Sequence, residues 1–136
     1  MAASRREGRR GPPDEGDVAR VHEVEGFTVL VGRSARDNDT LSLKVARPRD
    51  LWFHAAGVAG SHVVVRRPES GEDPPRSVID RAAQLAAWHS KARNARGKVP
   101  VHWCPAAEVS KVRGAPAGQV RLGRYDTLKV YPKGEE

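Results

Sequence analysis

The chain has 136 residues, 38% of them hydrophobic, and carries a formal net charge of +7 with a pI near 10.2. This length fits one domain with a modest core and leaves little room for a large enclosed active-site cavity. The single cysteine, Cys104, excludes an intramolecular disulfide and a zinc site of thiolates, and no apolar run approaches the ~20 residues of a membrane span. These features predict a cytoplasmic protein without membrane association, and the charge favours a polyanionic partner.

The N-terminal residues 1–17 combine arginine, glycine, proline and acids with almost nothing to bury. They predict a disordered tail of mixed charge and lack the apolar core of a secretion signal. The folded domain is therefore expected over 18–136. Within it, two β-like runs at 18–24 and 27–32 flank a glycine turn and predict a hairpin.

A short helix is predicted after this hairpin. Asn38 or Asp39 is suited to the N-cap position, and the following sequence TLSLKVA continues until Arg47-Pro48 ends it. The stretch 50–65, DLWFHAAGVAGSHVVV, then predicts a strand, a glycine turn and a second strand.

The first strand of this stretch has two chemically different faces. Alternation places Leu51, Phe53 and Ala55 on a core face. The other face carries Asp50, Trp52 and His54, a carboxylate, an indole and an imidazole in a row. This second face is either a functional site or a well-satisfied part of the scaffold.

A loop at 66–76 precedes the one strong helix, which Ser77 is expected to cap with Asp80 as the partner of a capping box. The helix is predicted to continue to about residue 93. Its predicted core-facing side chains are small or aliphatic except for one imidazole, and they are Val78, Ile79, Ala82, Ala83, Leu85, Ala86 and His89. A second stripe contains Trp88, which is either half-buried or a stacking platform.

The C-terminal third predicts three strands. The first, KVPVHWC, contains Pro100 and is expected at a sheet edge or bulge. QVRLG and TLKVYP are expected to pair as a closing hairpin. The element order β-β-α-β-β-α-β-β-β predicts a single α+β domain with a mixed, largely antiparallel sheet and one long and one short helix packed on it.

Positive charge is concentrated in the second half of the chain. Between 81 and 124 there are nine Lys or Arg residues and one acid, Glu108. Cations in the last turn of a helix are favoured by its dipole, which accounts for part of this cluster. Together with Trp88 and the histidines, the cations form a pattern typical of RNA recognition, in which they bind phosphates and flat rings contact bases.

The residues of the stretch 50–65 are also compatible with three other kinds of site. A metal-dependent hydrolase would use Asp50, His54 and His62, although their spacing matches no helical metal motif. A Ser61–His62 nucleophile is disfavoured because neighbouring strand residues point to opposite faces. The Gly57-x-x-Gly60 turn can offer backbone N–H groups to a phosphate, or can simply need positive φ. No metal or cofactor is expected.

Several ordered motifs resemble one family, the NFACT-R domain. They are Gly32-Arg33, Asn38-Asp39, Asp50-Leu51-Trp52-Phe53-His54, Gly60-Ser61-His62-Val63-Val64, Ser90-Lys91-Ala92-Arg93, Val99-Pro100-Val101 and Lys111 with Gly114-Ala115. The resemblance extends over about 20–132, and only this module is matched, so a standalone form is expected. Ser34, Ala59 and Trp88-His89 depart from the residues common in the family.

The resemblance implies a non-enzymatic RNA-binding domain that binds tRNA or ribosomal RNA in ribosome-associated quality control, with the large ribosomal subunit as a further partner. A module that docks on a ribosomal or other acidic protein is the alternative. The expected phosphate contacts are Arg33, Lys44, Lys91, Arg93, Lys111 and Arg113. His54, Ser61 and His62 are expected to shape a pocket or donate to the RNA, and Trp88 to stack.

Overall fold

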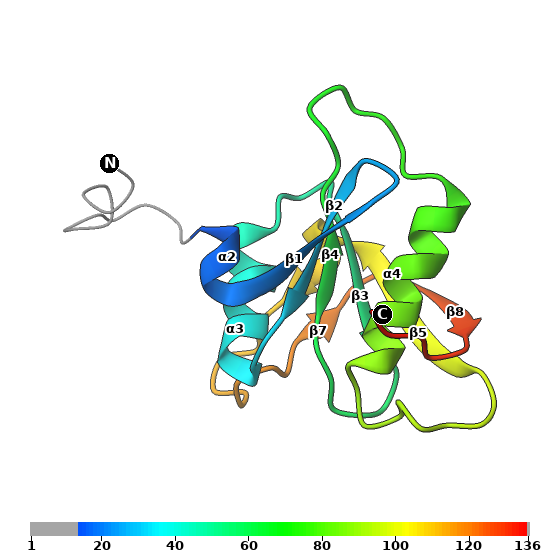
Figure 1. Ribbon diagram of the computed structural model, residues 1–136. Helices are drawn as coiled ribbons and strands as arrows, with labels where there is room; N and C mark the ends of the chain where they lie inside the picture. Colours follow the sequence, from blue (N-terminus) through cyan, green and yellow to red (C-terminus); the bar gives the residue numbers. More distant parts are fainter. Residues whose placement is uncertain (1–13, 136) are drawn as a thin grey trace.

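The computed structural model describes residues 14–135, and its central feature is a six-stranded sheet with the order β1-β2-β4-β3-β5-β8 (Figure 1). The strands are β1 (Ala19–Val24), β2 (Phe27–Gly32), β3 (Leu51–Ala55), β4 (Val63–Val65), β5 (Val99–Pro105) and β8 (Asp126–Val130). All neighbours in this part of the chain pair antiparallel. A separate two-stranded sheet joins β6 (Val109–Ser110) to β7 (Arg121–Leu122). The predicted α+β class is confirmed.

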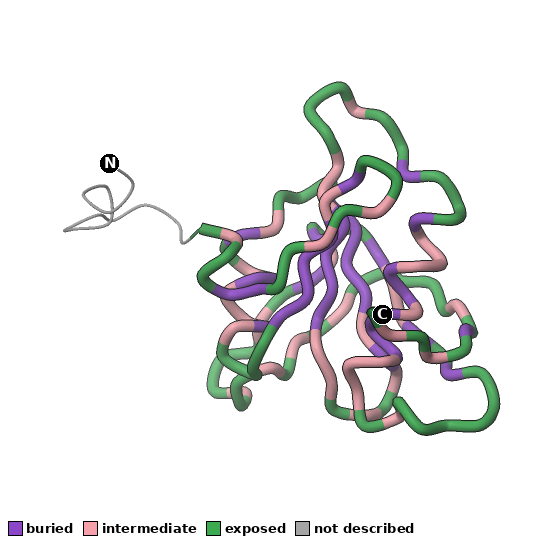
Figure 2. The backbone as a smooth tube through the Cα atoms, in the orientation of Figure 1, coloured by how far each residue is buried: buried purple, intermediate pink, exposed green. Residues whose placement is uncertain are grey.

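Both faces of the large sheet are covered. The long helix α4 (Arg76–Trp88) packs on one face against Phe53, Val63 and neighbouring residues. On the other face lie α2 (Glu15–Val18), α3 (Ala35–Thr40) and the π-helical turn η1 (Leu41–Val45). Figure 2 shows that burial is concentrated along the central strands between these layers.

The alternation predicted for β3 is confirmed, with one addition. Leu51, Phe53 and Ala55 lie in the core under α4. Trp52 points to the opposite face, where it is also buried, in a second core formed with η1. The polar face of this strand is therefore covered by protein along much of its length, because the sheet has helices on both sides.

The long helix differs from its prediction at both ends. It begins at Arg76 after Pro75, and the Ser77 hydroxyl donates to Glu25 rather than capping the helix. It ends at Trp88, so Lys91 and Arg93 lie beyond its C-terminus and not in its last turn. Most of the predicted core face is present, since Val78, Ala82, Ala83, Leu85 and Ala86 are all buried, and Ile79 packs half-buried against them. His89, also predicted on this face, lies past the end of the helix and lines both clefts.

The short helix begins earlier than predicted. Ser34 is its N-cap and accepts from the backbone N–H of Asp37 at 3.1 Å. Asn38, predicted as the cap, is instead buried inside the helix. The helix widens at η1, where the Ala46 N–H donates to Leu41 O, five residues back.

The predicted C-terminal hairpin is wrong. β7 pairs with β6, and β8 pairs with β5. Pro100 also lies inside the sheet rather than at an edge. Its carbonyl accepts from Ala56 N–H on the β3 side, and the nitrogen of the same residue faces that side too, so the missing N–H removes no bond to β8.

The boundary of the predicted N-terminal tail is also shifted. Residues 1–13 lie outside the described part of the chain, but Glu15–Val18 form α2, and Glu15 binds Arg66. The folded part therefore begins before residue 18.

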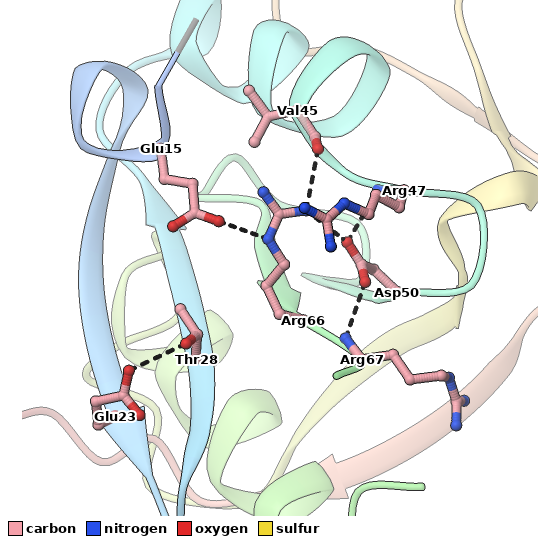
Figure 3. Close-up of polar contacts among 8 residues, drawn as sticks. All are labelled: Glu15, Glu23, Thr28, Val45, Arg47, Asp50, Arg66 and Arg67. Atoms are coloured by element: carbon pink, nitrogen blue, oxygen red, sulfur yellow. Dashed lines mark hydrogen bonds and ion pairs between the residues drawn. The ribbon is translucent and has the colours of Figure 1, made fainter. Parts of the chain in front are cut away.

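Asp50 is a structural anchor at the start of β3 (Figure 3). Its side chain is 1% exposed and pairs with Arg66 at 3.0 Å. It also accepts from the backbone N–H groups of Arg47 and Arg67, both at 2.9 Å. Arg66 donates further to Val45 O, so one buried ion pair joins β3, the end of β4 and η1.

Replacing Asp50 with Asn is expected to lower the free energy of unfolding by about 3 kcal/mol, because it leaves Arg66 without its buried counter-ion and sets an amide N–H₂ group against N–H donors. Urea denaturation measures this. Asp73→Asn is the matched control: Asp73 also pairs with an arginine, Arg67, but is 86% exposed, and its loss should cost less than about 0.5 kcal/mol. Equal effects of the two substitutions would contradict the anchoring role.

Candidate nucleic-acid interface

An open cleft of about 790 Å³ lies on the α3 side of the sheet, over the paired strands β3 and β5. We call it the aromatic cleft. Its floor comes from the even-numbered residues of the two strands and its far wall from the loop 116–120. The lining includes Arg33, Asn38, Trp52, His54, Ser61, His62, His89, His102, Gln119 and Tyr125.

A chain of buried hydrogen bonds supports this cleft from below. Trp52 Nε1 donates to Ser42 Oγ at 2.8 Å, and Ser42 Oγ lies 2.7 Å from His62 Nδ1. His62 Nε2 lies 3.1 Å from Gly118 O, which can only accept. His62 therefore carries its proton on Nε2 and accepts at Nδ1 from the Ser42 hydroxyl. Because every donor in this series of hydrogen bonds has a partner, the His62 imidazole is held in one tautomer and one orientation.

The deep histidines of the cleft are uncharged at neutral pH. Burial lowers the pKa of His62 to about 4, and neighbouring His54 contributes in the same direction. Burial, followed by the nearby His102, likewise lowers the pKa of His54. A charged imidazole is disfavoured at these positions because water is excluded and the rings crowd one another.

Two groups of rings on neighbouring strands line the cleft from the core to the surface. The centroids of His54 and His62 are 5.1 Å apart, and that of Trp52 lies 6.0 Å from His54. His54 is the cross-strand partner of His102, whose ring centroid lies 4.4 Å from that of Tyr125. Tyr125, at 45% exposure, forms the solvent end of the second group.

A second cleft of about 390 Å³ adjoins the first. We call it the basic cleft. It is lined by Arg20, Gly32, Arg33, Ala59, Gly60, Ser61, Trp88, His89, Ser90, Lys91 and Arg93. Four of these are cations, and no acid is among the described residues that line it. The segment Ala59–Ser61 separates the two clefts and lines both.

Two backbone hydrogen bonds join this separating segment to the residues that follow α4. Ser61 N–H donates to His89 O and Lys91 N–H donates to Ala59 O, both at 2.9 Å. Gly60 is required for close packing, since a β-carbon there would lie 2.6 Å from Ser90 Cβ, whereas Gly57 has a φ of +73°. Both donors of Ser61 are engaged within the protein, because its N–H binds His89 O and its hydroxyl donates to Gly32 O at 2.7 Å. The turn therefore offers a phosphate fewer free hydrogen-bond donors than its two glycines suggest.

The structure gathers most of the predicted site residues. Arg33, His54, Ser61 and His62 line the aromatic cleft, and Arg33, Ser61, Trp88, Lys91 and Arg93 line the basic cleft. Lys44 and Arg113 are exposed but line neither cleft. Lys111 also lines neither, and it is engaged internally.

Lys111 fixes the loop 112–119. Its ammonium pairs with Asp39 at 3.0 Å and donates to Gln119 O at 2.9 Å and to Pro116 O. Gly118 N–H donates to Asp39 Oδ1. Lys111 thus acts on the aromatic cleft through the position of the loop, and its predicted role as a phosphate contact is not supported by these bonds.

Trp88 does not present an open ring. The guanidinium carbon of Arg93 lies 4.1 Å from its ring centroid. Gly134 packs so closely that a β-carbon there would lie 2.3 Å from the indole nitrogen. Next to it, Glu135 pairs with His89 at 2.9 Å. The half-buried alternative describes Trp88 better than a stacking platform.

Four functional candidates that line the clefts were not predicted from the sequence: Arg20, His102, Gln119 and Tyr125. His102 lies opposite His54 only because β5 pairs with β3. Tyr125 reaches the cleft only because β8 pairs with β5. The one available signal was the even spacing of His102 and Cys104 on a predicted strand, which puts both on one face.

The residues of the alternative metal site do not converge. The Asp50 carboxylate is occupied by Arg66 and two backbone N–H groups, and the His62 nitrogens by Ser42 and Gly118. Among residues 14–135, no three His, Cys, Asp or Glu side chains are placed to hold a metal ion. Burial raises the pKa of Cys104 to about 11, which keeps it a thiol.

Across residues 14–135, no helix has the length and apolarity to cross a membrane.

Comparison with known proteins identifies the family to which this domain belongs. A family described as the NFACT protein RNA binding domain matches residues 18–123. The chain belongs to the NFACT-R family of RNA-binding domains. It is also similar to a solved structure, the C-terminal part of the fibronectin/fibrinogen-binding protein from Streptococcus suis. That similarity has a TM-score of 0.77 and 36% identity, and covers 92% of this chain and 47% of that one.

Curated relatives of this NFACT-R domain are larger proteins. The Rqc2 homolog RqcH of Bacillus subtilis is 33% identical over 136 residues, which cover 99% of this chain and 23% of that protein. The ribosome quality control complex subunit NEMF homolog of Drosophila melanogaster is 30% identical over 95 residues, covering 70% of this chain and 9% of that protein. The chain thus spans less than a quarter of either relative.

The buried neutral state of His62 predicts how stability depends on pH. Unfolded His62 binds a proton below about pH 6.5, whereas the folded domain resists protonation down to about pH 4. Its contribution is therefore complete above pH 6.5 and is lost as the pH falls towards 4, by up to about 3 kcal/mol. Urea unfolding across this window, compared with His62→Gln, measures the difference. Parallel pH profiles for the two proteins would contradict the prediction.

Proposed function

We propose that this NFACT-R domain binds tRNA or ribosomal RNA without catalysing a reaction, with the RNA backbone lying along the basic cleft. The observation that carries the proposal is the convergence of Arg20, Arg33, Lys91 and Arg93 on one concave surface beside a cleft lined by rings. Cations and flat rings side by side are what single-stranded or structured RNA requires of a protein.

The cations of the basic cleft come from separate parts of the chain. Arg20 lies on β1, Arg33 follows β2, and Lys91 and Arg93 follow α4. Arg33 is partly committed, because it donates to Ala19 O at 3.2 Å and to Gly16 O. Lys91 and Arg93 are exposed and border the bridge to Ala59. They are therefore the main candidates for phosphate contacts.

The state of the potentially reactive side chains in and near the clefts supports a binding role. The His62 imidazole serves as an internal hydrogen-bonding group, Asp50 is locked in an ion pair, and Cys104 stays a thiol. A translation context, with the large ribosomal subunit as a partner in the cytoplasm, is part of the proposal. It is supported by the names of the relatives, one of which is a subunit of a ribosome quality control complex.

Replacing Lys91 and Arg93 together with Ala is expected to weaken RNA binding and to flatten its salt dependence. Loss of two phosphate contacts lowers the slope of log affinity against log salt by about 1.4 for single-stranded RNA and by about 1.8 for a duplex. Fluorescence anisotropy with a labelled tRNA, measured over a range of KCl concentrations, gives this slope.

The double variant of Arg49 and Lys129 is the matched control. Both residues are exposed cations outside the clefts, so the same net charge is removed while the slope should change by much less. An unchanged slope for the Lys91 and Arg93 variant would reject the basic cleft as the phosphate site. Capture of a ribosomal partner that survives nuclease treatment, without measurable RNA affinity, would instead favour the protein-docking alternative.

A further inference from the structure

The two clefts divide the chemistry of a nucleotide between them. The described residues that line the aromatic cleft include one Lys or Arg, Arg33, which stands at its border with the basic cleft. The remainder of that lining is rings, apolar groups, the hydroxyls of two serines and neutral amides. We propose that the aromatic cleft receives one unpaired nucleobase of the RNA whose phosphates lie in the basic cleft. This inference rests on the proposed function and assigns its specificity site.

The floor of the aromatic cleft suits a flat heterocycle. His54 and His102 lie side by side on neighbouring strands, and Tyr125 extends this floor to the solvent. A base stacks on such rings whatever its identity, since every base has a π face. Because the exposed Tyr125 lies at the mouth, its phenol ring is the natural stacking partner, and His102 holds that ring in place at 4.4 Å.

The charge state of the floor argues for a base over a phosphate. Both His54 and His62 are held in the neutral form by burial, so the deep end of the cleft offers an anion little attraction. Its volume of about 790 Å³ lies within the ~300–1,000 Å³ typical of small-molecule sites. The cations stand outside, on the far side of Ala59–Ser61, where the backbone of an inserted nucleotide would run.

The wall opposite the rings is held in position before any ligand binds. Lys111, Asp39 and His62 all bind the loop that ends in Gly118 and Gln119. Gln119 lines the cleft, and its side-chain amide can both donate and accept, as recognition of a base edge requires. A preformed wall lowers the entropic cost of binding.

This arrangement requires an unstacked base, because a base inside a duplex cannot enter a cleft between a sheet and a loop. The domain should therefore prefer RNA loops and single strands. Tyr125→Ala is expected to weaken binding of a short single-stranded RNA by roughly fivefold or more, the range seen on removal of one stacking ring. Tyr125→Phe should retain the affinity, because the ring and not the hydroxyl is needed.

The experiment measures anisotropy with single-stranded RNA, the same RNA carrying one abasic site at successive positions, and a blunt RNA duplex. A 2-aminopurine placed at the sensitive position reports stacking by its fluorescence. The wild-type domain should quench this probe, Tyr125→Ala should not, and the salt slope should be the same for both. Tyr131→Ala is the control, since Tyr131 is also exposed, at 57%, but lines neither cleft.

The outcomes separate this inference from the proposed function. If the wild-type domain binds RNA with the salt dependence set by Lys91 and Arg93, but Tyr125→Ala behaves like Tyr131→Ala and no abasic position matters, then nucleobase capture is overturned and RNA binding stands. Equal affinity for the blunt duplex would overturn it in the same way. If the wild-type domain binds none of the RNAs, both proposals fail.

Discussion

The hydrogen-bonded chain from Trp52 through Ser42 to His62 and Gly118 is the interaction on which the rest of this domain depends. It connects a central strand, the π-helical turn, the segment before β4 and the loop that closes the aromatic cleft. All of its side chains are buried, so each donor must have a partner or cost roughly 1–3 kcal/mol. Since every donor has one, the chain fixes a single arrangement of the cleft instead of merely filling space.

The same interaction decides the electrostatics of the surface above it. A histidine buried among rings, with both nitrogens engaged, remains neutral, and its neighbour His54 does so for a related reason. Positive charge lies instead at the border and on the far side of Ala59–Ser61, where Arg33, Lys91 and Arg93 are found. The proposed division between a base-binding and a phosphate-binding cleft is a consequence of this packing.

The family motifs gain a physical meaning from the structure. Asp50, Trp52, Asn38 and His62 carry much of the resemblance to NFACT-R domains, and all four are buried. Asn38 accepts from His62 N–H and donates to Gly60 O, and Asp50 holds the start of β3 to Arg66. These residues build the support of the interface. Among the groups proposed to contact RNA, Lys91 and Arg93 belong to a family motif, whereas Arg20 and Tyr125 belong to none of the motifs named above.

The sequence by itself determined the features that follow a local period. Alternation identified the core face of β3, the 3.6-residue repeat identified the buried face of α4, and several of the cleft residues lie in motifs that local pattern singled out. Only the tertiary structure decided which strands pair. Pairing of β5 with β3 set His102 beside His54, and pairing of β8 with β5 rather than β7 brought Tyr125 to the cleft. Long-range pairing leaves no periodic trace, because it depends on burying both faces of the sheet at once. The ion pair of Lys111 with Asp39 is equally hidden from local patterns, since the two residues are distant in sequence.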